Sequence, residues 1–388
     1  QDIYVKGGDI YNVHTNVNFT AVVADGKANA DFAVAVLSID MTDRYENIAE
    51  GVKQAEILYL LADPTDAQVQ KYRAVLDTTV AAEMAAREQM AEDYLAYFAI
   101  LADKNIDAVY VATNNASHAE IAIKAMEAGK HVIVEKPIAT TPADAKRMVD
   151  LAAEKKLCLS VDHMMVYNAY NVMAKKYVRA GKLGDVNDCC FHMEFAFGYD
   201  PAEAATWRCS KIEEMGGPIG DVASHCFYVS EFIFGSRIVE VSCVYLPKTM
   251  NIVAEDGAYI KFTMANGMKG SVKVAFSEPR GGLVGTLSNL GYEIYGTEGV
   301  LRSYGSMFQL SGKEDEPYKI RLEMETAAGV RKLHPRSFPN IYQSLIEHHA
   351  ESVLAGKAIN AREGLRNLQL CEAAHKSAQQ GGKAVAVK

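Results

Sequence analysis

The chain has 388 residues, of which 49% are hydrophobic, and its formal net charge is -9 at pH 7. A chain of this length exceeds one compact core of ordinary size, so we expect two domains. No basic stripe is available to neutralise a phosphate backbone, and no apolar run approaches the roughly 20 residues that span a bilayer. These totals argue against nucleic acid and membranes as partners.

The seven cysteines are scattered along the chain, with no C-x-x-C pair and no histidine cluster at the spacing of metal ligands. We therefore expect neither a disulfide framework nor a metal site. Reduced thiols favour a cytoplasmic protein. The sequence begins at Gln1 rather than Met, so an exported form whose leader has been removed stays open as an alternative.

Residues 1–30 contain two short β-type runs that end in turns, which predicts a small N-terminal β extension. From Asp31 onward, short apolar runs alternate with longer segments in which apolar residues recur every three or four positions. This alternation predicts a Rossmann-like, doubly wound parallel sheet over residues 31–137. The expected strands are 32–37, 56–61, 108–112 and 131–134, and the expected helices are 44–54, 66–101 and 118–128.

Residues 138–388 are predicted to form an α+β domain with a large open, mostly antiparallel sheet. Asn266-Gly267 favours a tight hairpin within it. Two C-terminal helices, separated by residues 356–360, are expected to pack back on the first domain. A helix ending at Lys156 and a strand at 157–161 are expected to add one more unit to the parallel pattern, and a helix ending at Ala180 follows. The strands expected after it are 191–197, 238–245, 258–265, 268–276 and 292–295.

The loop after the first strand lacks the glycines of a dinucleotide-binding fingerprint. The pattern G-x-G-x-x-G permits a tight turn and a close approach of backbone N–H groups to a pyrophosphate. Residues 38–43 read Ser-Ile-Asp-Met-Thr-Asp instead. Ser38 is small enough to bind there with the backbone of the next residues, whereas Asp40 would bring a carboxylate close to two phosphate charges.

Asp63 lies at the end of the second predicted strand, twenty positions after Asp43. An acidic residue there accepts hydrogen bonds from the adenosine ribose and repels a 2′-phosphate, which favours NAD over NADP. Alternatively, Asp63-Pro64 starts a turn and caps the following helix.

The most informative pattern is Glu135-Lys136-Pro137 at a strand end, together with Asp221 and His225 much later in the chain. Side chains at the carboxyl ends of parallel strands face the crevice where α/β proteins bind ligands. His225 fits a general base, and Lys136 could stabilise a developing alkoxide or share the proton. On a helix, Asp221 lies one turn before His225, so it could orient or charge-balance the imidazole, or bind a substrate hydroxyl.

Three further residues are candidates for contacting a substrate. Trp207, the only tryptophan, could stack on a sugar face while Arg208 binds hydroxyl groups, or it could simply anchor its loop in the core. Tyr167 follows a predicted strand closely enough to reach the same crevice.

Several segments resemble the Gfo/Idh/MocA oxidoreductases. Residues 111–119 are similar to V-A-T-P-N-x-x-H-A, with Asn114 in place of proline, and residues 129–137 are similar to G-K-H-V-x-x-E-K-P. Trp207-Arg208 and residues 216–225 follow the family's W-R and G-G-G-x-x-x-D-x-x-x-H order.

The resemblance implies a nicotinamide nucleotide with Asn115, His118 and Glu135 near its ribose and Lys136 beside the reacting carbon. It also implies carbohydrate substrates and a homo-oligomer, dimer or tetramer, formed through the open sheet. We therefore expect an NAD-dependent oxidoreductase acting on a hydroxyl of a sugar, polyol or sugar derivative.

Two other functions are compatible with the same residues. Some relatives retain NAD and cleave glycosidic bonds through transient oxidation and elimination. Loss of the glycines would also suit a cofactor-free lyase or isomerase, or a protein that only binds a ligand.

Overall fold

The computed structural model describes residues 34–37, 99–277, 290–307 and 320–387. The chain divides into two compact units between Val132 and Ile133, and each is described by itself. Several predictions lie outside the described residues: the N-terminal extension, Ser38, Asp40, Asp43, Asp63, the strand 56–61, the helix 44–54 and most of the helix 66–101.

The first unit contains parallel strands. Strand β1 (Val34–Leu37) pairs with β2 (Ala108–Val111), whose four residues are all buried. Helix α3 (His118–Glu127) follows and ends before Gly129, whose φ of +82° reverses the chain toward the next strand. Burial of a strand on both faces is typical of a parallel sheet covered by helices.

The first sheet has the strand order β1-β2-β3-β4, with β3 at His131–Val134 and β4 at Leu159–Val161. Helix α4 (Pro142–Lys155) connects β3 to β4, and its first turn is capped by the Thr141 side chain. The predicted parallel sheet is therefore confirmed for the described strands.

The second sheet has nine strands in the order β12-β11-β10-β9-β5-β8-β7-β6-β13. All neighbouring pairs are antiparallel except β5 with β8. The predicted mostly antiparallel sheet is confirmed. Its strands are β5 (Val186–Glu194), β6 (Ile238–Tyr245), β7 (Gly257–Met264), β8 (Lys269–Ala275), β9 (Leu290–Gly296), β10 (Val300–Tyr304), β11 (Arg321–Thr326), β12 (Gly329–Leu333) and β13 (Val385–Ala386).

Strands β10 to β13 were not predicted. Charged residues occupy β11 and β12, as in Arg321, Glu323 and Lys332, so the apolar period is short and weak. Strand β11 buries only Leu322 and Met324, and β12 buries only Leu333, which is paired with Leu322. Sheet pairing therefore stabilises segments whose own sequence is typical of a polar loop.

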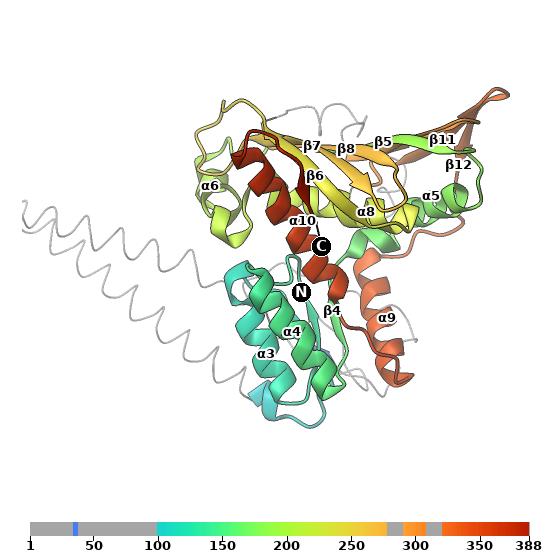
Figure 1. Ribbon diagram of the computed structural model, residues 1–388. Helices are drawn as coiled ribbons and strands as arrows, with labels where there is room; N and C mark the ends of the chain where they lie inside the picture. The colour runs from blue at the N-terminus through green and yellow to red at the C-terminus, as the bar shows by residue number, and fades with distance from the viewer. Residues whose placement is uncertain (1–33, 38–98, 278–289, 308–319, 388) are drawn as a thin grey trace, which may run out of the picture. The chain divides into compact units, whose positions relative to one another are not determined.

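Helices cover one face of the nine-stranded sheet (Figure 1). Helix α8 (Ser224–Phe234) packs against β5, and α10 (Arg362–Gln379) packs against β6 and α4. Helix α5 (Ala169–Arg179) packs on α8, and α9 (Ile341–Leu354) packs on the short 3-10 helix η3 (Met164–Tyr167).

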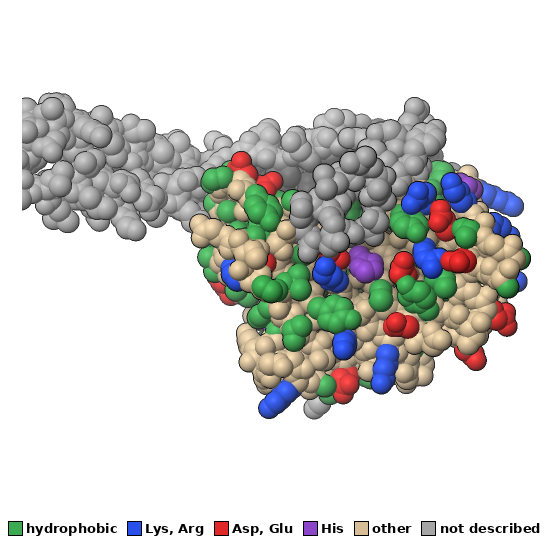
Figure 2. All heavy atoms as spheres, turned by 90° about the horizontal axis from the view of Figure 1, so that it is seen from above, with side chains coloured by type: hydrophobic (Ala, Val, Ile, Leu, Met, Phe, Trp, Pro, Cys, Tyr) green, Lys and Arg blue, Asp and Glu red, His purple; other side chains and the backbone are tan. Residues whose placement is uncertain are grey.

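The face seen in Figure 2 carries side chains of both charges among hydrophobic ones. Arg302 lies between Glu293, at 3.5 Å, and Glu325, and Lys273 binds Glu194 at 3.0 Å. The expectation that this sheet forms oligomer contacts stays a prediction.

Within the described part of the chain, no helix has the length and apolar character needed to cross a membrane.

Candidate active site

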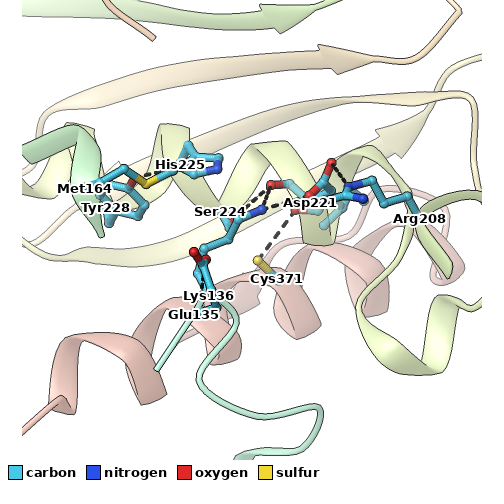
Figure 3. Close-up of polar contacts among 10 residues, drawn as sticks. Glu135, Lys136, Met164, Arg208, Asp221, Ser224, His225, Tyr228 and Cys371 are labelled. Atoms are coloured by element: carbon cyan, nitrogen blue, oxygen red, sulfur yellow. Dashed lines mark hydrogen bonds and ion pairs between the residues drawn. The ribbon is translucent and has the colours of Figure 1, made fainter. Parts of the chain in front are cut away.

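Lys136 and Asp221, which are 85 positions apart in the sequence, form a buried ion pair (Figure 3). Lys136 Nζ donates to Asp221 Oδ1 at 2.8 Å and to the Asp221 backbone oxygen at 2.7 Å. The two side chains are only 11% and 9% exposed. The fold therefore brings together two of the residues that the sequence singled out.

The glycines before Asp221 allow close packing of its segment. Gly217 has a φ of +81°, and a Cβ there would lie 2.5 Å from a carboxylate oxygen of Glu255. A Cβ on Gly220 would lie 2.1 Å from the backbone oxygen of Met215. Glu255 in turn accepts a hydrogen bond from the Ile219 amide at 2.9 Å. Only glycine fits these two positions without displacing its neighbours.

Arg208 supplies a second cation to Asp221. Its Nε lies 3.4 Å from Asp221 Oδ2, and its guanidinium carbon lies 4.6 Å from the centroid of the Trp207 ring. Trp207 begins the short helix α7 (Trp207–Ser210). One indole face therefore supports the guanidinium, and Arg208 remains 42% exposed.

The charges in this cluster do not cancel. Burial alone raises the pKa of Asp221, but the charges of Lys136 and Arg208 outweigh it and lower that pKa to about 2. Asp221 is thus a carboxylate at neutral pH, and one anion faces two cations. The buried Lys136 ammonium, with the partly exposed Arg208 guanidinium beside it, would favour a developing oxyanion.

His225 lies on α8 and is 4% exposed. Its Nδ1 is 2.6 Å from the hydroxyl oxygen of Tyr228, one turn later on the same helix. Burial, followed by the positive charge of Lys136, holds the pKa of His225 well below its ordinary value of 6.5. The imidazole is therefore neutral at physiological pH.

Among the described contacts, the Asp221 carboxylate binds Lys136 and Arg208. That it orients or charge-balances His225 stays a prediction. Residues Ile219–Ala223 form a π-helix, with wider turns than an α-helix. The four-residue spacing of an α-helix therefore does not apply across Asp221 and His225. The carboxylate still affects the ring through its charge, which raises the pKa of His225 against the larger effect of burial.

Two family models match this chain. The oxidoreductase family with an NAD-binding Rossmann fold, Gfo/Idh/MocA, matches residues 50–163, and the Gfo/Idh/MocA C-terminal domain matches residues 172–302. The chain belongs to the Gfo/Idh/MocA oxidoreductase family. The first match begins after residues 38–43, the segment in which the glycine fingerprint is missing.

Curated relatives include dehydrogenases of cyclic polyhydroxy compounds. The levoglucosan dehydrogenase of Pseudarthrobacter phenanthrenivorans is 27% identical over 311 residues, 74% of each chain. The scyllo-inositol 2-dehydrogenase (NADP(+)) of Bacillus subtilis is 28% identical over 296 residues, 72% of this chain and 78% of that protein. A 1,5-anhydro-D-fructose reductase of Ensifer adhaerens matches over 60% of its own length. Two dTDP-3,4-didehydro-2,6-dideoxy-alpha-D-glucose 3-reductases match over 40% and 42% of theirs.

A solved structure of levoglucosan dehydrogenase in complex with NADH and levoglucosan shares the fold. Its TM-score is 0.62 at 24% identity, over 75% of this chain and 82% of that one. This likeness supports the fold of the two Gfo/Idh/MocA domains.

The residues predicted to contact a nicotinamide nucleotide follow two of the described strands, and that role stays a prediction. After β2, Asn115 is 4% exposed and His118 is fully buried, with its Nε2 3.0 Å from the Thr113 backbone oxygen. After β3, Glu135 Oε2 accepts from the Lys136 amide at 3.2 Å. Amide, imidazole, carboxylate and ammonium groups can all bind ribose hydroxyls or the nicotinamide.

Tyr167 lines a cavity of about 260 Å³ whose lining includes neither Lys136 nor Asp221. Its hydroxyl is 2.7 Å from Nδ1 of His348, and burial, with the nearby Asp162 and Glu363 carboxylates, raises its pKa to about 12. No hydrogen bond described for Tyr167 joins it to Lys136 or Asp221, and its contact with a substrate stays a prediction. The cavity is lined by Ser160, Val161, His163, Val166, Tyr167, Tyr228, Glu231, Phe232, Leu345, His348, Ile359, Glu363 and Asn367.

Sequence reasoning missed several residues that support the cluster. Ser224 Oγ donates to the Asp221 backbone oxygen at 3.1 Å, and Asn367 Nδ2 donates to the Ser224 backbone oxygen at 2.9 Å. Tyr228 and Glu255 were also missed. Tyr228 stands in the apolar run of α8, where the pattern indicates packing, and the position three after His225 was the only available signal.

Among residues 34–37, 99–277, 290–307 and 320–387, no group of three His, Cys, Asp or Glu residues could hold a metal ion.

Proposed function

We propose that this protein is an NAD-dependent oxidoreductase that acts on a hydroxyl group of a sugar, polyol or sugar derivative. The observation that carries the proposal is the buried Lys136-Asp221-Arg208 cluster, with its excess positive charge, in a member of the Gfo/Idh/MocA family. We include His225 in this site because burial, followed by the positive charge of Lys136, lowers the pKa of its imidazole.

The nicotinamide ring, when bound, would accept or supply the hydride. Lys136 and His225 are the groups of this chain that would stabilise the alkoxide and carry the hydroxyl proton. Lys136 is held in place by two hydrogen bonds to Asp221, so its third N–H remains for a substrate oxygen. A neutral His225 can accept or donate a proton, depending on which nitrogen carries the hydrogen.

Arg208 and Trp207 are proposed to bind the rest of the substrate. The guanidinium is 42% exposed while one side of it is fixed to Asp221, so its free N–H groups can bind hydroxyls. The relatives named for levoglucosan and scyllo-inositol suggest a cyclic polyhydroxy substrate. NAD is preferred over NADP in this proposal because Asp63 would repel a 2′-phosphate.

The first test is to denature the purified protein and to look for released NAD or NADP by mass spectrometry, alongside titration of the native protein with NADH. Bound or titratable NAD is expected. Absence of both nucleotides up to millimolar concentrations would refute the redox proposal and would favour a cofactor-free lyase or isomerase.

The second test uses C-deuterated levoglucosan and inositols as substrates with NAD. Transfer of deuterium to form deuterated NADH is expected for at least one of them. A glycosidase that retains NAD would instead release a cleaved sugar without accumulating NADH, which would contradict net oxidation.

A further inference from the structure

The Tyr228 hydroxyl is the only hydrogen-bond partner that the structure gives to His225 among the described residues. Tyr228 is 6% exposed and His225 is 4% exposed. Their ring centroids are 5.4 Å apart at an interplanar angle of 66°, and the 2.6 Å contact joins Nδ1 to the phenolic oxygen (Figure 3). Nε2 is therefore the nitrogen that remains for other partners.

Two other groups approach the phenolic oxygen of Tyr228. The Met165 amide donates to it at 3.4 Å, and the Met164 sulfur lies at 3.8 Å. A phenol has one proton to donate, and a thioether sulfur is a much weaker acceptor than an imidazole nitrogen. The hydroxyl proton is therefore best directed at Nδ1 of His225, and the Met165 amide binds a lone pair on the same oxygen.

Both rings are in the protonation states that this arrangement needs. Burial is the main cause that raises the pKa of Tyr228 well above 10, so the phenol keeps its proton. Burial and Lys136 keep the pKa of His225 low, as described above, so the imidazole carries a single hydrogen. When Nδ1 accepts from Tyr228, that hydrogen must be on Nε2.

His163 holds the Tyr228 ring from a different segment. The two rings are stacked, with centroids 4.1 Å apart and an interplanar angle of 14°. His163 is neutral as well, because burial and the charge of Lys136 lower its pKa to about 3. The phenol is thus fixed by stacking, by the Met165 amide and by its own helix.

We propose that Tyr228 is a positioning residue that fixes the neutral His225 ring with its hydrogen on Nε2, so that His225 meets the reacting oxygen as a hydrogen-bond donor. This inference deepens the proposed oxidoreductase function and rests on it for the identity of the reacting oxygen. In such an enzyme, His225 stabilises negative charge on the oxygen. With Nε2 protonated, His225 donates a hydrogen bond to this oxygen, and the hydroxyl proton is exchanged with Lys136.

The test is a long-range ¹H–¹⁵N correlation spectrum of the full-length protein labelled with ¹⁵N-histidine. The His225 signals are identified by their loss in His225→Gln. We expect the pattern of an Nε2–H ring in the wild-type protein at pH 7.5. An Nδ1–H ring or a charged ring would overturn the proposal, whether or not Tyr228→Phe folds.

Tyr228→Phe provides the second readout, and Tyr292→Phe is the matched control. Tyr292 is buried as well, and its hydroxyl donates to Asn171 Oδ1 at 3.0 Å, away from His225. Tyr228→Phe is expected to give a mixture of the two His225 ring forms and about a tenfold lower kcat with little change in KM. Tyr292→Phe is expected to leave the His225 signals and the kinetics unchanged.

An unaltered His225 spectrum in folded Tyr228→Phe would refute the positioning role. Because the spectrum is recorded on the free protein, it does not depend on the redox proposal. A correct Nε2–H pattern without nucleotide binding would contradict the proposed function and leave the ring geometry intact.

Discussion

Asp221 lies within residues 216–225, and Glu255 accepts a hydrogen bond from the same segment, at Ile219. Both carboxyl groups are buried, but they differ in charge. Asp221 faces Lys136 and Arg208, which lower its pKa to about 2 against the effect of burial. Glu255 accepts the Ile219 amide, and burial raises its pKa to about 7 despite that hydrogen bond and the charge of Lys248. Similar burial thus gives a permanent anion at one position and a carboxyl that titrates near neutrality at the other.

Removal of the Lys136 charge should have the largest effect on activity. In Lys136→Met the side chain keeps its approximate size but loses the ammonium group, so kcat is expected to fall about a thousandfold. Steady-state kinetics, with the substrate identified by the deuterium-transfer test, would measure this fall in kcat. Lys146→Met is the control, because Lys146 lies on α4 with a side chain that is 66% exposed and should retain wild-type kinetics. Comparable kcat values in both variants would eliminate Lys136 from the chemistry.

Gly217→Ala should have the next largest effect, on stability. A methyl group there meets the Glu255 carboxylate at 2.5 Å in backbone of positive φ, so the free energy of unfolding should fall by about 3 kcal/mol. Gly267→Ala isolates the backbone strain, because its φ is +86° and nothing lies within 4 Å of the added Cβ. We expect that control to lose only about 1 kcal/mol in urea unfolding. Equal losses would show that the contact with Glu255 is unimportant.

The two carboxyl groups should change the free energy of unfolding in opposite directions and in different pH ranges. The raised pKa of Glu255 means that the unfolded chain loses this proton first, so stability falls as pH rises from about 4.5 to about 7. The lowered pKa of Asp221 means that its contribution is lost as pH falls from 3.8 to about 2.

Glu255→Gln should remove the first of these contributions. Between pH 5 and pH 8, the free energy of unfolding of the wild type should fall relative to that of the variant by about 2 kcal/mol. The difference between the two proteins isolates Glu255 from the other groups that titrate in this range. Parallel pH profiles would mean that Glu255 is ionised throughout.

Arg208→Ala should have the smallest effect, because the side chain is 42% exposed and Lys136 still neutralises Asp221. We expect KM to rise about tenfold with a smaller change in kcat, as for the loss of a substrate-binding group. Arg208→Lys should recover only part of this, since it lacks the planar guanidinium. A fall in kcat at unchanged KM would instead assign Arg208 to the chemistry.

Much of the fold was predictable because it depends on local pattern. Strand β6 has the predicted bounds, and β7 and β8 join through the Asn266-Gly267 turn, where Gly267 has positive φ. Strands β11 and β12 were not predictable, since their charged residues follow no clear apolar period and pair only within the sheet.

The sequence by itself determined the alternation of strands and helices and the family, and it predicted Lys136, Asp221 and His225 as site residues, because these depend on local pattern and on motif. Only the tertiary structure decided which atoms these residues contact. The segment around Asp221 is π-helical and lies against Lys136 and Arg208, so the imidazole takes its hydrogen bond from Tyr228 instead. Such partners are set by packing between distant segments, which residue spacing along one helix does not encode.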